Sequence, residues 1–185
     1  MSSQNVAPNK VFGPTNAANN KIGLIFYKNY INNLTISLKK IGININTVPV
    51  LDVLRKNTNK IIGNRSFSED PAVVKILGKV CVKQYELNKL ATVIKHLPGH
   101  GCASSDSHLK MPKVKLNYKD LNEVDFLPFK SNPSQFAMTA HILYEKIDKN
   151  NVATFSKKII SQIIRKKIGF KGILISDDIS MKALK

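Results

Sequence analysis

Residues 156–177 read SKKIISQIIRKKIGFKGILISD and carry the clearest secondary-structure signal in the chain. Isoleucines recur at helical spacing from Ile159 to Ile168, and Ser156 precedes them as an N-cap. Gly169 follows as a C-cap, and the apolar run of residues 173–175 then passes into Asp177. The segment predicts a helix followed directly by a short buried strand.

The same order of helix and strand occurs three more times. Helices are predicted over residues 21–41, from about Ser68 or Glu69, and over 120–129, with Ser68 as a cap and Pro71 in the first turn. The strands predicted after them are 43–52, 91–96 and 136–141. Such alternation is typical of an α/β fold, here about four βα units whose parallel strands are buried on both faces.

Length and composition fit one globular domain, since the 185 residues are 43% hydrophobic and 22% charged. Residues 1–20, rich in Asn, Ala, Ser and Pro, are expected to form a flexible N-terminal arm, and residues 21–185 the folded domain. No membrane span and no signal peptide are recognised, so no membrane partner and a cytoplasmic location are expected. Cys81 and Cys102 are expected to be free thiols.

The net charge of +17 raises the possibility of a nucleic-acid partner. Only three of the 29 basic residues are arginines, and the lysines are spread over predicted helix faces instead of forming one patch. No aromatic residues are interleaved with them in the manner of a single-strand binding groove. The pattern therefore favours a solvated lysine-rich surface over nucleic-acid binding.

Ionisable residues follow the predicted strands at their carboxyl ends. They are Asp52, Lys95, His96, His141 and Asp177. Parallel strands bring their carboxyl ends to one rim, where α/β proteins build their sites. A plain turn into solvent is the alternative interpretation of such polar strand ends. The repetition at four strands favours a functional rim.

The densest polar segment is residues 95–108, KHLPGHGCASSDSH. Zinc binding is one interpretation, but the Leu-Pro-Gly between His96 and His100 cannot continue a helix and so does not give a helical His pair. No metal is therefore expected. Asp106, two residues before His108, can instead orient the imidazole for proton transfer. A solvated turn remains the structural alternative for this loop.

The pair Asp177 and Asp178 ends the last predicted strand. Asp178 is predicted to lie at the start of a following helix and to cap it, which leaves the carboxylate of Asp177 for chemistry. A carboxylate that faces a proton donor is the arrangement of retaining glycosidases. The sequence thus offers one candidate nucleophile and one candidate proton-transfer pair.

Four segments carry a family resemblance: residues 63–71 (GNRSFSEDP), 95–108, 138–142 (MTAHI) and 175–181 (ISDDISM). In this order they resemble the signatures of the family 3 glycoside hydrolases, and the Asp-Ser-His ending of the second is similar to the bacterial β-N-acetylglucosaminidase branch. The resemblance implies a (β/α)8 TIM barrel. It also implies release of terminal β-linked N-acetylglucosamine, from peptidoglycan fragments in cell-wall recycling, without a cofactor.

The resemblance also implies roles for individual residues. Asp177 corresponds to the nucleophile, and His108 to the general acid/base with Asp106 as its partner. The positions implied to bind the sugar, or to lie at the polar rim, are Arg65, Lys95, His96, His141 and Asp52.

A complete barrel of this kind needs about 250 residues. Only four strands are recognised in this chain, and nothing before Gly42 corresponds to the family's Asp-Gln-Glu-Gly-Gly signature. A partial, truncated barrel is therefore expected. The alternative to an active glycosidase is an inactive remnant, or a carbohydrate-binding or interaction half-barrel that self-associates or needs a complementing chain.

Overall fold

The computed structural model describes residues 12, 21–56, 58, 60–103 and 111–184. The helices are α1 (Lys21–Lys40), α2 (Pro71–Leu87), α3 (Tyr118–Glu123) and the π-type helix η5 (Ile159–Ile168). The short 3-10 turns are η3 (Gly63–Arg65), η4 (Leu127–Phe129) and η6 (Lys182–Leu184). The strands are β1 (Ile45–Asn46), β2 (Ala91–Leu97), β3 (Lys113–Val114), β4 (Phe136–Thr139), β5 (Leu143–Tyr144) and β6 (Ile173–Ser176).

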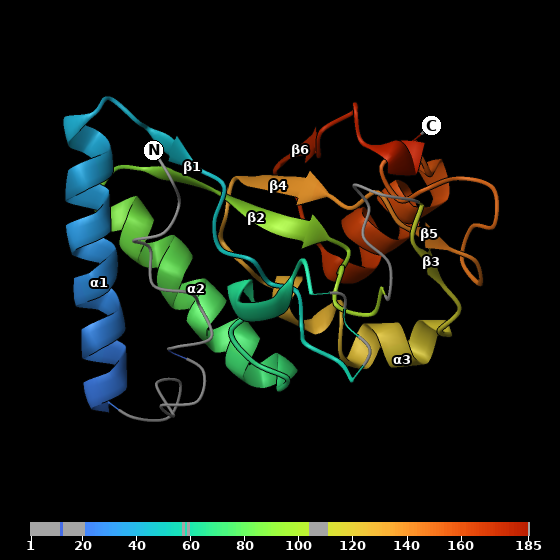
Figure 1. Ribbon diagram of the computed structural model, residues 1–185, viewed down its shortest axis with the longest axis horizontal. Coiled ribbons are helices and arrows are strands. Elements are labelled where there is room, and N and C mark those ends of the chain that lie inside the picture. Colours follow the sequence, from blue (N-terminus) through green and yellow to red (C-terminus); the bar gives the residue numbers. More distant parts are fainter. Residues whose placement is uncertain (1–11, 13–20, 57, 59, 104–110, 185) are drawn as a thin grey trace.

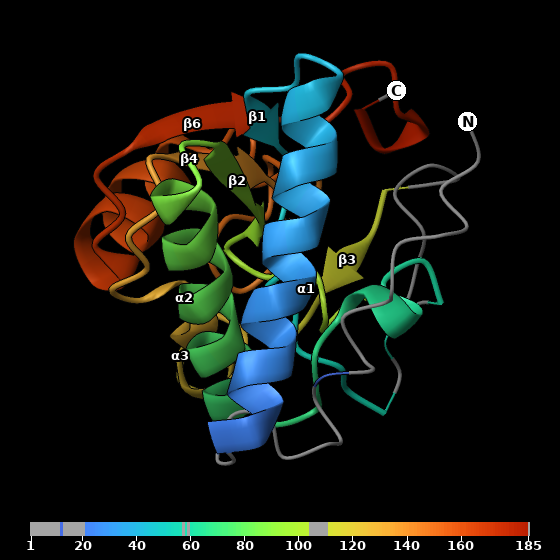
Figure 2. The same cartoon turned by 90° about the vertical axis from the view of Figure 1, so that its left-hand side faces the viewer.

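The main sheet has the strand order β1-β2-β4-β6, and all of its pairs are parallel (Figure 1). Helix α2 packs against β2 and against α1, which stands beyond the β1 edge of the sheet (Figures 1 and 2). The predicted α/β fold with parallel strands is confirmed. A second, two-stranded parallel sheet of β3 and β5 was not predicted, because strands of two residues leave no periodic signal.

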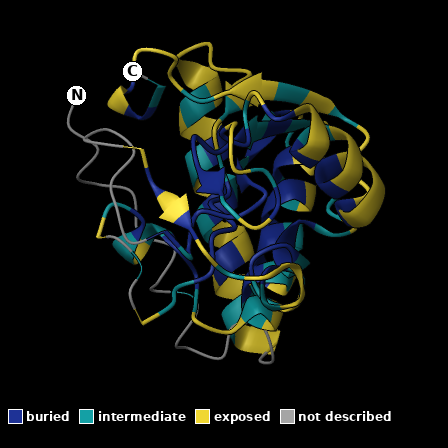
Figure 3. Ribbon diagram, turned by 90° about the vertical axis from the view of Figure 1, so that its right-hand side faces the viewer, coloured by how far each residue is buried: buried dark blue, intermediate teal, exposed yellow. Residues whose placement is uncertain are grey.

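The core lies between the sheet and its helices, as the buried residues in Figure 3 show. Ile94 of β2 and Ala137 of β4 are register partners on this face and belong to the same buried cluster as Leu77 of α2 and Ile163 of η5. Because strand side chains alternate, Val93 and Phe136 lie on the opposite face.

The helix around η5 follows the sequence prediction at both ends. Ser156 Oγ accepts a hydrogen bond from the backbone N–H of Ile159 at 3.0 Å, and Gly169 ends the helix in the left-handed region with φ of 80°. Ile159, Ile163, Ile164 and Ile168 are buried as expected. The π-type winding was not foreseen from the sequence.

The predicted start of α2 is wrong by two to three residues. Asp70, not Ser68, caps the helix, and its carboxylate accepts from the N–H of Ala72 at 2.8 Å. Ser68 Oγ instead accepts from the N–H of Asp70 at 3.1 Å. Pro71 occupies the first turn as predicted, and it makes the residue before it extended and thus suited to capping.

Two strand predictions also need correction. The predicted strand over 43–52 is continuous only at Ile45–Asn46, and further on only Val50 bridges to Lys95. Pro49 lacks an N–H and cannot continue the ladder. The expectation that the strands are buried on both faces is wrong at β6, where Ile173 is 59% and Ile175 37% exposed, because β6 is an edge strand.

Helix α3 and the turn η4 replace the single helix predicted over 120–129. Asn117 caps α3 by accepting from the N–H of Asp120.

Cys81, on α2, and Cys102, in the loop after β2, are free thiols as predicted. Within the described residues, no helix has the length and apolar character of a membrane span.

The predicted N-terminal arm falls outside the described residues except for Phe12. The Phe12 ring packs against Tyr27 and Tyr30 of α1, with centroid separations of 4.6 and 5.2 Å. Tyr27 and Ile31 form the buried stripe of α1.

Candidate active site

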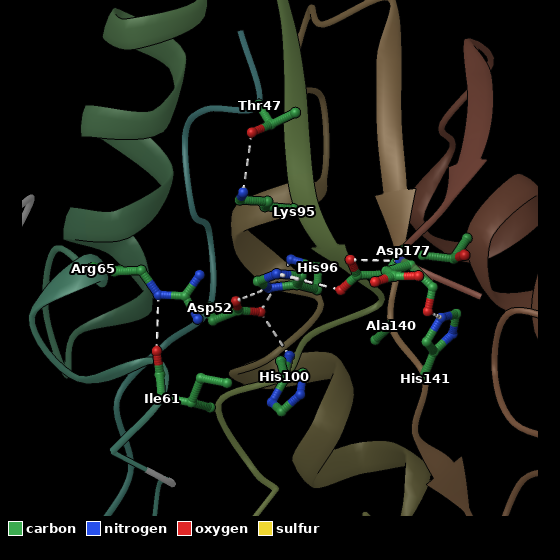
Figure 4. Close-up of polar contacts among 12 residues, drawn as sticks. Thr47, Asp52, Ile61, Arg65, Lys95, His96, His100, Ala140, His141 and Asp177 are labelled. Carbon is green, nitrogen blue, oxygen red and sulfur yellow. Dashed lines mark hydrogen bonds and ion pairs between the residues drawn. The ribbon is translucent and has the colours of Figure 1, made fainter. Parts of the chain in front are cut away.

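A pocket of about 260 Å³ opens at the carboxyl ends of the sheet strands. Its lining residues are Ile61, Ile62, Arg65, Lys95, His96, His100, Asp177, Asp178 and Met181. Of the residues singled out from the sequence, Arg65, Lys95, His96 and Asp177 thus converge on one site (Figure 4). They come from η3, from β2 and from the residue after β6, and the first and last of them are more than a hundred positions apart in the chain.

Asp52 lies behind the pocket and is fully buried. Its Oδ1 accepts from the backbone N–H groups of His96 and His100, at 3.2 and 2.6 Å. Its Oδ2 lies 2.6 Å from Nδ1 of His96. Burial alone would raise the pKa of Asp52, but attraction and hydrogen bonding from His96, with a smaller contribution from His100, hold that pKa below its ordinary value.

The His96 ring links Asp52 to Asp177. A charged carboxylate can only accept, so Nδ1 carries the proton that faces Asp52. Nε2 then points toward the pocket, 4.0 Å from Oδ2 of Asp177, which is beyond hydrogen-bond distance. The buried Asp52 therefore fixes the orientation of a ring whose other nitrogen faces the candidate nucleophile.

Lys95 and Arg65 supply positive charge to the same pocket. Lys95 Nζ donates to Thr47 Oγ1 at 3.2 Å, and Arg65 Nε donates to the carbonyl oxygen of Ile61 at 2.8 Å. Burial and the nearby Arg65 lower the pKa of Lys95, while Asp177 and Asp52 act in the opposite direction. Two cationic donors thus flank one carboxylate, and both can give charge-assisted hydrogen bonds to a ligand in the pocket.

Asp177 and Asp178 have different surroundings. Asp177 Oδ1 accepts from the backbone N–H of Asp178 at 2.9 Å, and its Oδ2 is the oxygen nearest His96. Asp178 Oδ1 accepts from the N–H of Ser180 at 2.8 Å, in the turn before η6. Asp178 therefore caps a turn, and the helix predicted to start there is present only as the short 3-10 turn η6, while the Asp177 side chain faces the pocket.

His141 lies behind the backbone of Asp178, not among the pocket-lining residues. Its ring is buried, with Nδ1 2.7 Å from Thr154 Oγ1 and Nε2 3.2 Å from the carbonyl oxygen of Asp178. Thr139 Oγ1 donates to Thr154 Oγ1 at 3.0 Å and approaches the carbonyl oxygen of Ile175 at 3.4 Å. These contacts, which we call the β4 brace (Thr139, His141 and Thr154), hold the chain on both sides of Asp177.

Thr154 was missed by sequence reasoning, because nothing local marks a threonine as a long-range hydrogen-bond partner. His100, which the sequence offered only as half of a possible metal-binding pair, lines the pocket. Its ring lies edge-on to His96, with centroids 5.5 Å apart, and burial lowers the pKa of His100. Among the described residues, no group of three His, Cys, Asp or Glu is arranged to hold a metal ion.

The loop that carries His100 is pressed against the segment after Asp52. A Cβ added to Gly101 would lie 1.8 Å from the carbonyl oxygen of Val53, so only glycine fits there. Arg55, in the same segment, pairs with the buried Asp125 through Nε at 3.1 Å and through Nη2. This ion pair, missed from the sequence, ties the segment after Asp52 to the residues between α3 and η4.

The predicted proton-transfer pair, Asp106 and His108, lies outside the described residues, which stop at Ala103 and resume at Met111. Their roles stay predictions, as do the nucleophile role of Asp177 and the sugar-binding or rim roles of Arg65, Lys95, His96, His141 and Asp52. A second pocket of about 200 Å³ lies at the opposite, amino ends of β2 and β4 and gathers no comparable set of ionisable groups.

Comparisons with known proteins give consistent results. Residues 7–185 match the family model described as the glycosyl hydrolase family 3 N terminal domain. Beta-hexosaminidase A of Pseudoalteromonas piscicida is 36% identical over 162 residues, covering 80% of this chain and 27% of that protein. The beta-hexosaminidase of Hydrogenovibrio crunogenus is 34% identical over 169 residues, covering 90% and 47%.

Solved structures agree. Native NagZ from Neisseria gonorrhoeae has a TM-score of 0.87 at 29% identity, covering 98% of this chain and 55% of that chain. A family 3 β-N-acetylglucosaminidase from Paenibacillus sp. has a TM-score of 0.85 at 28% identity, covering 95% and 33%. The chain therefore spans less than half the length of these two curated relatives and matches only part of the solved structures.

Proposed function

Because this chain belongs to glycosyl hydrolase family 3, whose N-terminal domain it matches over residues 7–185, we propose that it cleaves β-linked N-acetylglucosamine with Asp177 as the nucleophile. The observation that carries the proposal is the pocket in which Asp177 lies beside His96, Lys95 and Arg65. A carboxylate among hydrogen-bond donors can attack an anomeric carbon while the donors hold the sugar hydroxyls.

The reaction has two steps. In the first, a carboxylate oxygen of Asp177 attacks the anomeric carbon, the glycosidic C–O bond breaks, and the leaving oxygen takes a proton from His108. In the second, His108 removes a proton from water, the water oxygen attacks the same carbon, and the ester to Asp177 breaks with net retention. Asp106 stabilises the protonated imidazole between the steps.

The described residues have supporting roles in this scheme. Lys95 and Arg65 donate to sugar hydroxyls and balance the charge of Asp177 before attack. Asp52 keeps the His96 ring in place, so that Nε2 faces both Asp177 and the space for the sugar. The β4 brace fixes the backbone from which Asp177 projects, which limits the positions its carboxylate can take.

The names of the relatives support the substrate class. Two curated relatives are named beta-hexosaminidases, and a solved NagZ structure holds N-trifluoroacetyl-D-glucosamine. The narrower parts of the proposal, peptidoglycan fragments as the source of the sugar and the cytoplasm as the location, are supported by the resemblance alone.

The test is turnover of an aryl β-N-acetylglucosaminide by the wild-type chain and two variants. Asp177→Ala should abolish turnover. His108→Ala should retain more activity on substrates with good leaving groups than with poor ones, because activated aryl groups depart with little protonation. Glu123→Ala, which removes an exposed carboxylate on α3, is the matched control and should equal the wild type.

A slow fluorinated substrate should leave a glycosyl adduct on Asp177, located by peptide mass spectrometry. An adduct on another carboxylate, or an active Asp177→Ala variant, would refute the assignment of the nucleophile. A folded wild-type chain that neither turns over substrate nor forms an adduct would refute enzymatic activity and favour the inactive remnant or the half-barrel that needs a complementing chain.

A further inference from the structure

The ring of His100 lies in the wall of the pocket but forms no hydrogen bond within the described residues. His100 lines the pocket and is only 3% exposed. Its Nδ1 is buried and has no partner in the part of the chain that the structure describes. Nε2 has no partner there either, and it is not one of the buried side-chain atoms, so this nitrogen has a surface that faces the pocket.

Neighbouring polar side chains of the pocket differ from His100, because they have partners within the protein. Nδ1 of His96 is paired with Asp52, and Nζ of Lys95 donates to Thr47 Oγ1. The His100 ring instead meets the His96 ring edge-on, with centroids 5.5 Å apart. An apolar aromatic ring could make this contact as well. Since native proteins leave few buried polar groups unpaired, the nitrogens of His100 need another explanation.

The backbone at His100 is held in place from two sides. The N–H of His100 donates to Oδ1 of the buried Asp52 at 2.6 Å (Figure 4). One residue earlier, the hydroxyl of Tyr144 donates to the carbonyl oxygen of Gly99 at 2.5 Å. A ring that is almost fully buried on such a backbone cannot turn out into solvent to find partners. The position of the ring in the pocket is therefore built into the fold.

The His100 ring is neutral at pH 7. Burial lowers the pKa of His100 below its ordinary value of 6.5, and the positive charges of His96 and Arg65 act in the same direction, against the attraction of Asp52. A neutral imidazole has one nitrogen that donates a hydrogen bond and one that accepts. Nε2 therefore offers the pocket an uncharged hydrogen-bonding atom, beside the charged donors of Lys95 and Arg65.

We propose that Nε2 of His100 forms a hydrogen bond with a hydroxyl group of the bound sugar, and that His100 is thereby a specificity-determining residue of the pocket. A hydroxyl group can donate to a bare nitrogen or accept from a protonated one, so it suits either tautomer of the neutral ring. The bound sugar supplies the partner that the ring lacks in the free protein. Because this contact takes its ligand class from the proposed function, it is tested by binding and not by turnover.

The first experiment compares His100→Phe with His100→Gln in thermal unfolding without a ligand. His100→Phe keeps an aromatic ring against His96 and removes a buried nitrogen that has no partner, so its melting temperature should equal or exceed that of the wild type. His100→Gln keeps a polar group but loses the ring contact, and it should melt at a lower temperature. If His100→Phe is less stable than His100→Gln, the ring nitrogens support the fold and the proposal is overturned.

The order of the two variants should reverse in binding. The probe is N-acetyl-D-glucosamine, which has no glycosidic bond to cleave, and its binding is measured by calorimetry at pH 7. The dissociation constant should rise about tenfold in His100→Phe, the value of one neutral hydrogen bond, and less in His100→Gln, whose amide can still pair with a hydroxyl. Tyr118→Phe is the matched control, because it removes a hydroxyl from an exposed ring outside the pocket, and it should bind like the wild type.

Monodeoxy analogues of the probe, each lacking one hydroxyl group, identify the contact. Removing the hydroxyl that pairs with His100 should weaken binding to the wild type about tenfold and leave binding to His100→Phe almost unchanged. The other analogues should lose equal affinity in both proteins.

The proposal is wrong if every analogue loses the same affinity in the wild type and in His100→Phe, or if the wild type does not bind the probe at millimolar concentrations. Failure of the proposed function gives a different result. A wild type that binds the probe through His100 but cleaves no glycoside would refute cleavage and support the contact, whereas active enzyme with unchanged binding in His100→Phe would refute the contact alone.

Discussion

Replacing Asp52 with Asn tests how much of the site depends on one buried carboxylate. The two side chains have nearly the same shape, so packing is preserved. In Asp52→Asn the amide oxygen can still accept hydrogen bonds from the backbone N–H groups of His96 and His100. The amide N–H₂ group then takes the place of Oδ2. His96 Nδ1 must then accept a hydrogen bond, which moves its proton to Nε2 and toward Asp177.

The three hydrogen bonds to Asp52 determine the size of the effect. A bond to a charged group is worth roughly 1.5–3 kcal/mol and a neutral one about 0.5–1.5 kcal/mol, so losing the charge costs about 1 kcal/mol per bond. Relief from burying a charge offsets part of this, and we expect Asp52→Asn to lower the free energy of unfolding by about 2 kcal/mol. Asp52→Ala also leaves buried N–H groups unpaired and should cost about 4 kcal/mol.

The effect should depend on pH. Because the folded-state pKa of Asp52 is below its unfolded value, the stability from its charge is fully present above the unfolded pKa of about 3.9. This stability is lost as pH falls through the lower folded pKa. The difference between wild type and Asp52→Asn should therefore be constant from pH 5 to 7 and shrink below about pH 4.

Urea unfolding at one low protein concentration, at pH 7 and at several values below pH 4, measures these differences. Glu123→Gln, an exposed carboxylate changed in the same way, is the control and should have little effect at any of these pH values. The reasoning is refuted if Asp52→Asn is as stable as the wild type at pH 7, if it loses as much stability as Asp52→Ala, or if the difference does not change in acid.

Two further predictions concern the β4 brace and the thiols. Thr154→Val removes the hydroxyl that contacts Thr139 and His141, and it should lower the free energy of unfolding in urea by about 1–2 kcal/mol. Thr154→Ser keeps a hydroxyl and should retain most of the stability. Equal losses in the two variants would contradict the β4 brace. Burial raises the pKa of Cys81 to about 12 and also raises the pKa of Cys102. Because the thiolate is the reactive form, a thiol reagent at pH 8 should modify both cysteines only after unfolding. Rapid labelling of the native chain would contradict this prediction.

The sequence was sufficient to predict features that depend on neighbouring residues. Ser156 and Gly169 bound their helix as predicted, and each of the four predicted strands contributes to one parallel sheet. The convergence of Arg65, Lys95, His96 and Asp177 could also be predicted, because parallel strands deliver their carboxyl ends to one rim. These predictions rest on local capping, on periodicity and on one topological rule.

The features that were missed depend on contacts between distant residues. Arg55 and Asp125 are 70 positions apart, and Thr154 meets His141 across a loop, so no local pattern marks either pair. The capping role of Asp70 was missed because Ser68, Glu69 and Asp70 are adjacent polar residues, and only the backbone angles decide among them. The exposure of β6 was missed because an apolar strand sequence does not tell an edge from a centre.

The position of Asp177 at the end of β6 affects how the site is lost on heating. An edge strand has hydrogen bonds on one side only, and in β6 most side chains are exposed, so it opens locally at a lower free-energy cost than β2 or β4. With β6 paired to β4 alone, Asp177 should leave its position on heating while most of the helices and the central strands stay folded. Thermal inactivation would then precede global melting, and the gap between the two temperatures would measure the support that β6 receives from its neighbours.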